Sequence, residues 1–122
     1  MSDTNIIDWE QLEMIFGEED EFDEDMAELY EEFLEDGKNR LDIIKGANFP
    51  DEKDLIAKES HKLKGSASNF GFAQMASLLG DIENDIDSIT IESLQEHLSK
   101  AEAAFGESQQ QVLTKYPAVG NN

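Results

Sequence analysis

The chain has 122 residues, a length that fits one domain over 1–122, with 29 acidic and nine basic residues and a formal net charge of −20. This charge argues against binding nucleic acid or anionic lipid, because neutralising phosphates takes Lys and Arg, and it favours a monomer over tight self-association. Without Cys, a secretory signal or a run of ~20 apolar residues, the sequence excludes disulfides and Cys catalysis and predicts a cytoplasmic protein that does not enter a membrane.

A short first helix is predicted by the stretch "IIDWEQLEMIFG". Asp8 suits its N-cap and Gln11 falls at the third helical position, which is the arrangement of a capping box. Ile7 and Leu12 occupy the two positions of a hydrophobic staple, which fixes how the chain enters the helix. Gly17 suits the C-terminal stop.

A second, longer helix is predicted from about Glu21 to Lys45, although this stretch is rich in acids. Twelve acidic residues lie between positions 18 and 36, and apolar residues recur every three or four positions, with a slip near Gly37. Such spacing gathers the apolar side chains on one face of a helix. The predicted apolar stripe consists of Phe22, Met26, Leu29, Tyr30, Phe33, Leu34, Leu41 and Ile44.

Three further helices complete the pattern. The break "GANFPDEKD" precedes a third helix, for which Asp51 suits the N-cap and which runs to about Phe70. A fourth is expected over about 73–85 and a fifth over about 91–116, followed by a frayed tail at 117–122. Because no strand pattern competes and the loops are short, we expect an all-α fold: an antiparallel four-helix bundle with a short additional N-terminal helix, ordered over about 6–116.

His61 is one of two histidines and lies in the third predicted helix, within "ESHKLKGSASNFGF". It lies about 120° to 140° from the centre of that helix's apolar face on a helical wheel. We therefore expect an exposed imidazole at the edge of the bundle rather than a core histidine. The apolar face consists of Ile56, Ser60, Leu63, Ala67 and Phe70.

The residues after His61 suit the approach of an anion. Lys64 leans its ammonium toward the ring, because helical side chains point toward the N-terminus of their helix. Gly65 leaves the space above the ring open, although a glycine inside a helix costs about 1 kcal/mol relative to alanine. A neutral imidazole has a nucleophilic nitrogen, and the lysine can stabilise the oxygens of a phosphoryl group. An accidental surface histidine is the alternative that these residues leave open.

Other chemistries have little support in the sequence. The helical neighbours of His61 are Ala57, Lys58, Lys64 and Gly65, none of which is a metal ligand of ordinary type, so no metal site is expected. The stretch "DIENDIDSITIE" spaces its acids like a calcium loop, but it has Ile86 where the turn of that loop requires glycine. No nucleophile elbow accompanies the histidine, which argues against a serine hydrolase.

The segment "HKLKGSASNFG" resembles the signature of the histidine-phosphotransfer family, H-x-L-K-G-[SA]-[SA]-x-x-[hydrophobic]-G, and the helical pattern resembles that family from Ile6 to about Leu113. The resemblance implies that His61 takes a phosphoryl group from the phospho-aspartate of one receiver domain and gives it to the aspartate of another. It also implies that Lys64 holds the phosphoryl oxygens and that Gly65 gives the receiver access.

The resemblance also bears on Glu83, which occupies the place of a glutamine that often faces the histidine from the next helix. A carboxylate there would repel a phosphoryl group, so a role for Glu83 in orienting the imidazole is only a candidate. Lys62 stands where autokinase domains carry an acid, and no glycine-rich ATP-binding segment is present. We therefore expect a free-standing shuttle in a two-component system, without autokinase or ATPase activity.

The resemblance implies response-regulator receiver domains as partners, with a hybrid sensor histidine kinase as a further candidate. No bound cofactor is expected, and Mg²⁺ would belong to the receiver. A docking patch is predicted at Trp9, Leu12, Ile15, Phe16 and Ser68, and the alternative for the first four is that they cap the bundle core. His97 is interpreted as an ordinary helix residue.

Two other classes of function compete with phosphotransfer. A non-catalytic acidic helical adaptor would use the same bundle without phosphorylation of His61. An acidic nucleic-acid mimic or histone-type chaperone is suggested only by the charge.

Overall fold

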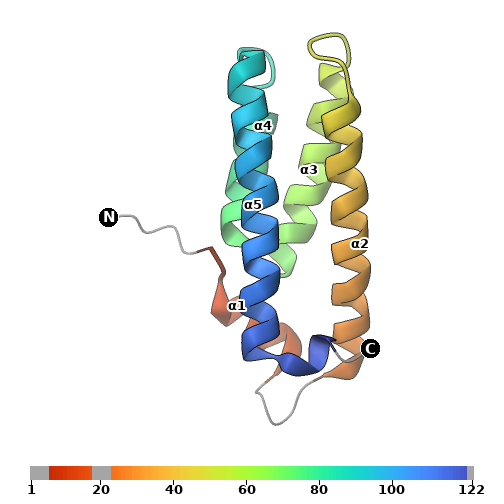
Figure 1. Cartoon of the computed structure of the whole chain (residues 1–122), viewed down its shortest axis with the longest axis vertical. Helices are drawn as coiled ribbons and strands as arrows, with labels where there is room; N and C mark the ends of the chain where they lie inside the picture. The colour runs from red at the N-terminus through yellow and green to blue at the C-terminus, as the bar shows by residue number, and fades with distance from the viewer. Residues whose placement is uncertain (1–5, 18–22, 121–122) are drawn as a thin grey trace, which may run out of the picture.

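A computed structural model describes residues 6–17 and 23–120 (Figure 1). All of the regular structure in these residues is helical, which confirms the predicted all-α class. The elements are α1 (Trp9–Phe16), α2 (Glu24–Gly46), α3 (Lys53–Asn69), α4 (Ala73–Asn84), α5 (Ile91–Lys115) and a short 3₁₀ helix, η2 (Pro117–Gly120). In the described ranges, no helix has both the length and the apolar character needed to cross a membrane.

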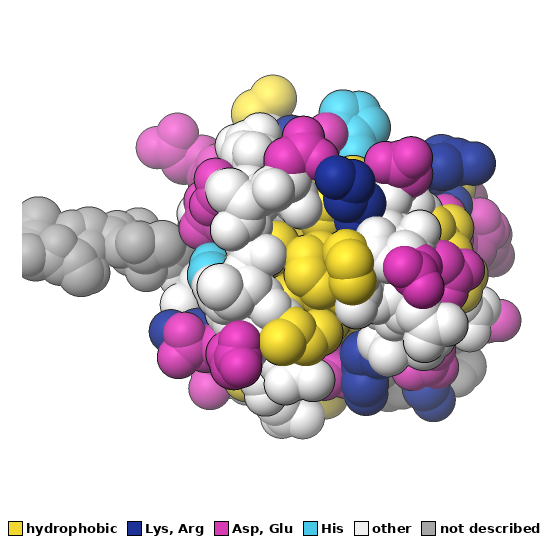
Figure 2. Space-filling view, turned by 90° about the horizontal axis from the view of Figure 1, so that it is seen from above, with side chains coloured by type: hydrophobic (Ala, Val, Ile, Leu, Met, Phe, Trp, Pro, Cys, Tyr) yellow, Lys and Arg dark blue, Asp and Glu magenta, His cyan; other side chains and the backbone are white. Residues whose placement is uncertain are grey.

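The four long helices run antiparallel, and α1 lies across one end of the bundle with η2 nearby (Figure 1). α3 packs against both α2 and α4, and α4 packs against α5, so α3 and α4 form the most closely paired side. The end-on view in Figure 2 shows apolar side chains near the centre and acidic side chains distributed around the rim. This arrangement is what a stripe of apolar residues on each helix produces.

The irregular apolar spacing near Gly37 in the second predicted helix is explained by a packing contact. The buried residues of α2 step evenly through it, and a Cβ atom at Gly37 would lie 2.9 Å from Cζ of Phe105 on α5. The glycine therefore admits an aromatic ring from the opposite helix. Leu29, predicted to be in the stripe, is 47% exposed instead, because Tyr30 and Ala27 take the inward positions of that turn.

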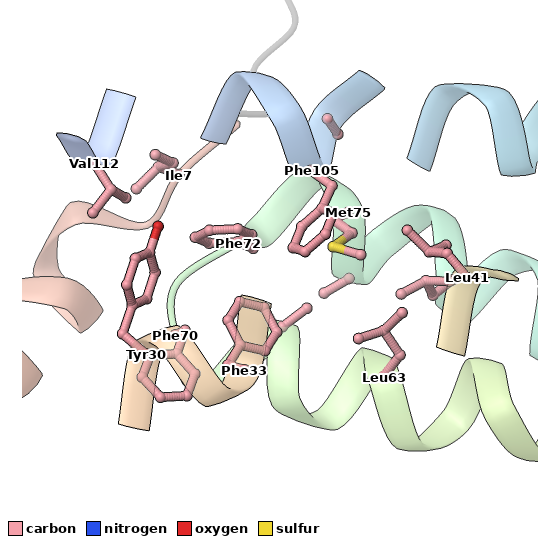
Figure 3. Close-up of a cluster of buried hydrophobic side chains, with 14 of the residues drawn as sticks. Ile7, Tyr30, Phe33, Leu41, Leu63, Phe70, Phe72, Met75, Phe105 and Val112 are labelled. Carbon is pink, nitrogen blue, oxygen red and sulfur yellow. The ribbon is translucent and has the colours of Figure 1, made fainter. Parts of the chain in front are cut away.

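Aromatic rings fill the centre of the core (Figure 3). Phe33 of α2 stacks on Phe70 at 4.9 Å between ring centroids, and Phe72 meets Phe33 edge-on at 5.0 Å. Tyr30 contacts Phe70 and Phe72, and burial raises the pKa of its hydroxyl. The turn between α3 and α4 is thereby anchored to α2, which fixes how the two helices meet.

The start of α1 is attached to the same turn. Asp8 caps α1 as predicted, accepting a hydrogen bond from the Gln11 backbone N–H at 3.2 Å. The Gln11 side chain does not complete a capping box, because its amide donates to the Asn69 carbonyl at the end of α3 at 3.0 Å. The Asp8 N–H also donates to the Gly71 carbonyl at 2.8 Å. Gly71 has φ +74, and its lack of a Cβ lets the Asp8 backbone approach.

Several predicted boundaries shift in the structure. The predicted start of the second helix near Glu21, with Phe22, lies outside the described residues, and Asp23 caps α2 by accepting from two backbone N–H groups. Asp51 does not cap α3, because it lies in the preceding turn and Glu52 takes the cap position without a side-chain hydrogen bond.

The predicted frayed tail is also corrected over 117–120. These residues form η2, and Val119 is only 7% exposed because it packs against the core.

Candidate functional site

α3 presents His61 to solvent because its other face is committed to the core. The predicted inward residues are all buried, and the His61 side chain is 65% exposed. The position of α3 is further fixed by Arg40 of α2, which donates to the nearly buried Glu59 at 2.6 Å and to Asp36 at 2.8 Å. His61 therefore projects from a helix that is held on two sides.

Glu83 of α4 brings the site together. Its Oε2 atom lies 2.8 Å from Nδ1 of His61, and its Oε1 atom accepts a hydrogen bond from Nζ of Lys64 at 3.0 Å. One carboxylate thus bridges the imidazole and the ammonium, with its own side chain 26% exposed. This geometry makes Glu83 the residue that contacts the imidazole from the next helix.

The contact with Glu83 selects one form of the neutral ring. A carboxylate accepts, so Nδ1 carries the proton and donates, and the lone pair is then on Nε2. Within the described ranges Nε2 of His61 has no polar partner, whereas Nδ1 is engaged. The nucleophilic nitrogen is therefore the one that does not face Glu83.

The charge of Glu83 is supported by its neighbours. The hydrogen bond from Lys64, and then the nearby His61, hold the pKa of the Glu83 carboxyl below its ordinary value of 4.5. Partial burial acts in the opposite direction but does not prevail. Glu83 is accordingly ionised at neutral pH.

Gly80 of α4 makes room for Lys64. A Cβ atom at position 80 would lie 3.3 Å from Cδ of Lys64, which is tighter than most carbon contacts. The lysine stem therefore crosses the backbone of α4 on its way to Glu83. Gly80 was not predicted as a site residue. The sequence feature that could have indicated it is a glycine inside a predicted helix, as at Gly65.

Gly65 adjoins open space. A Cβ atom built there would meet no other group within 4 Å, and the residue is exposed. Beside Lys64, a groove of about 490 Å³ lies between α3 and α4. Its lining includes Lys64, Ser68, Ala76, Ser77 and Gly80, and these mostly short side chains keep the surface next to the imidazole shallow.

The predicted docking patch divides into two groups in the structure. Leu12 and Phe16 are fully buried, so they belong to the core, which is the alternative role that the sequence left open. Trp9 and Ile15 are partly exposed. Trp9 lies under the ammonium of Lys115 at 5.3 Å.

Ser68 is exposed and lines the groove beside Lys64, whereas Trp9 lines a different hollow along α5.

His97 lies in a different environment from His61. Its Nδ1 atom donates to the Ser93 carbonyl of its own helix at 2.8 Å, and its Nε2 atom lies 3.9 Å from a carboxylate oxygen of Asp81. Its side chain is 24% exposed. Across the described ranges, no group of three or more His, Asp and Glu side chains could hold a metal ion.

A comparison with known protein families gives one result that agrees with this geometry. A family model described as "Hpt domain" matches residues 28–104, a range that contains His61, Lys64, Gly65 and Glu83. The match confirms the resemblance drawn from the sequence, and it covers α3 and α4 entirely but not α1. Comparisons with curated proteins and with solved structures gave no match.

Proposed function

The chain belongs to the Hpt domain family, whose members are helical bundles that act in histidine phosphotransfer with receiver domains, and on that premise we propose that His61 is its phosphoryl acceptor. The proposed donor is the phospho-aspartate of one receiver domain, including that of a hybrid sensor histidine kinase, and the proposed acceptor is the aspartate of another. The proposed setting is the cytoplasm. The observation that carries the proposal is the pair of contacts from Glu83 to His61 and Lys64.

In the proposed transfer, Nε2 of His61 attacks the phosphorus of the acyl phosphate. An N–P bond forms while the P–O bond to the aspartate breaks, and the electron pair leaves with the aspartate carboxylate. The ring becomes cationic as it loses its lone pair to phosphorus, and Nδ1–H then donates to an ionised Glu83. The carboxylate therefore stabilises charge that develops only as the bond forms.

This arrangement also weakens the expected repulsion between Glu83 and the phosphoryl group. Glu83 contacts the Nδ1 side of His61, whereas the proposed N–P bond forms at Nε2, so the ring separates the two groups. Lys64 contacts Glu83 and is proposed to donate its remaining N–H groups to phosphoryl oxygens. Transfer of the phosphoryl group from His61 to the aspartate of a second receiver follows the same steps in reverse.

Mg²⁺ is proposed to reside on the receiver, where it would neutralise charge on the transferred group. In the chain itself, the groups that act are His61, Lys64 and Glu83, with Gly65 giving access. His61 is proposed to attack the phosphorus and Lys64 to stabilise the phosphoryl oxygens. Glu83 accepts the hydrogen bond from Nδ1–H, and Gly65 leaves space for the receiver.

The proposal is tested by incubating the protein with a receiver domain that carries a labelled phosphoryl group. We expect label on the wild type, none on His61→Gln, and full labelling of His97→Gln. Circular dichroism should show unchanged helicity for both variants, because neither histidine is part of the core: the His61 side chain is 65% exposed and that of His97 is 24% exposed. The bond should break in acid and survive alkali, as a phosphoramidate does.

Labelling of His61→Gln would contradict the assignment. Receiver binding without any transfer to the wild type would favour the adaptor instead. Incubation with ATP and Mg²⁺ alone should leave the protein unlabelled, and stoichiometric labelling by the purified protein would contradict the absence of autokinase activity.

A further inference from the structure

A groove of about 810 Å³ runs between α2 and α5 and shares no lining residue with the groove beside Lys64. These two helices close the bundle far more loosely than α3 and α4 do, and Figure 1 shows them in front of the other pair. The lining residues of α2 extend from Glu31 to Lys45. That span corresponds to about 20 Å of helix, or four turns.

Three apolar side chains contribute to the lining of this α2–α5 groove, and apart from Gly106 its other residues are polar or charged. Leu34 is partly exposed in it, and the nearly buried Leu41 and Phe105 contribute to its wall. Gly106 lies next to Phe105 in the middle of α5, and a Cβ atom there would meet no group within 4 Å. A glycine at such a position costs helix stability without relieving any contact inside the chain.

The rim of the groove is acidic. The lining holds four carboxylates against two ammonium groups, and one pair is internally satisfied, because Lys45 bridges to Glu102 at 2.9 Å across the two helices. The remaining charged residues, Glu31, Glu35, Lys38 and Asp42, are exposed along α2, so three carboxylates stand against one ammonium group. An acidic rim attracts basic side chains and disfavours a second copy of a chain with net charge −20.

From these observations we propose that the α2–α5 groove is a docking surface for a partner helix that is amphipathic and basic. The apolar face of such a helix lies against Leu34 and Phe105, and Gly106 lets its backbone approach closely. Its Lys or Arg side chains pair with the carboxylates of α2. A helix laid into a groove between two helices is a common mode of peptide recognition. The surface acts independently of phosphorylation at His61.

The test uses the full chain labelled with ¹⁵N and a synthetic Leu/Lys peptide of about 18 residues, designed with one apolar helical face. A peptide of the same composition in scrambled order is the matched control. At about 0.15 M salt, amide shifts should concentrate along the lining residues of α2 and α5, and the scrambled peptide should bind more weakly.

Two pairs of variants sharpen the test. Gly106→Gln fills the groove and should weaken peptide binding about tenfold or more, whereas Gly65→Gln makes the same change on the other face and should not. The double variant Glu31→Gln/Glu35→Gln should bind the peptide more weakly than Glu92→Gln/Glu96→Gln. Glu92 and Glu96 are exposed on α5 outside the groove.

Equal binding of the scrambled peptide, shifts centred near His61, or no effect of Gly106→Gln would each overturn the proposal. A concentration-dependent dimer whose shifts map to the groove would overturn it in favour of a second copy.

Discussion

Nδ1 of His61 lies 2.8 Å from Oε2 of Glu83, so the imidazole is held by a residue of the neighbouring helix. If this contact orients the ring and stabilises its developing charge, Glu83→Ala should slow phosphotransfer by about ten- to a hundredfold, the range expected for one charge-assisted hydrogen bond. Glu83→Gln keeps a hydrogen-bond acceptor and should lose much less. Single-turnover transfer from a phosphorylated receiver measures both, and a wild-type rate for Glu83→Ala would rule out the role.

The same carboxylate predicts a dependence of stability on pH. Lys64 and His61 lower the pKa of Glu83 in the folded state, so the unfolded state takes up a proton first as the pH falls. The stabilisation is therefore complete above the ordinary value of 4.5 and is lost as the pH falls through the lowered folded-state pKa.

Melting temperatures of the wild type and Glu83→Gln between about pH 3 and pH 7 check this prediction. The advantage of the wild type should be largest near neutral pH and should shrink in acid. Comparison with the variant is needed because many other carboxylates titrate in the same range. A difference that grows toward low pH would contradict the prediction.

Substitutions at Lys64 and Gly65 are expected to have different effects on receiver affinity and transfer rate. Lys64→Ala should slow transfer while receiver affinity changes little, because an exposed pair adds only about 0.2–1 kcal/mol to ground-state binding. Gly65→Gln should weaken binding and transfer together, since the new side chain enters the open space above His61. The fold should persist in Gly65→Gln, because a Cβ atom there meets nothing within 4 Å.

Receiver affinity, transfer rate and thermal stability, measured for both variants, separate these outcomes. Unfolding of Gly65→Gln would mean that the glycine serves helix packing, and the explanation of an open approach would then be wrong.

The inward face of α3 could be read from the sequence because helical periodicity alone determines which side chains share a face. Gly37 could not be placed, because a glycine carries no hydrophobic signal and its role is to admit Phe105 from a distant part of the chain. Leu29 was wrongly placed for a related reason, since periodicity does not say which of two adjacent apolar residues turns inward.

In the candidate site, too, some features follow from helical periodicity and others from packing between helices. The exposure of His61 follows from its own helix, whereas its contact with Glu83 depends on the register between α3 and α4. That register is set by tertiary packing and is not encoded in local spacing. Glu83 was named as a candidate only through the family resemblance. The bridge from Arg40 to Glu59 and the passage of Lys64 across Gly80 were not predicted, because both depend on how two helices pack.

The glycines of α2 and α5 give a matched pair for stability. Gly37→Ala should destabilise the protein by about 1–3 kcal/mol from overpacking against Phe105, reduced by a gain of about 1 kcal/mol in helix propensity. Gly106→Ala meets no neighbour and should show only the gain. Urea unfolding of both variants measures the difference, and equal stabilities would mean that the Phe105 ring moves aside at no cost.

Ile15 and Phe16 separate core packing from docking on the same helix. Phe16 is fully buried and packs against Tyr30 and Tyr116 at 5.6 and 5.2 Å between centroids, so Phe16→Ala should cost about 3–5 kcal/mol and lower the Tm by more than about 10 °C. Ile15 is partly exposed, and Ile15→Ala should change the Tm far less. If α1 contributes to receiver docking, Ile15→Ala should weaken receiver affinity while the Tm is nearly unchanged. Loss of affinity only in proportion to loss of stability, across both variants, would assign α1 to the core alone.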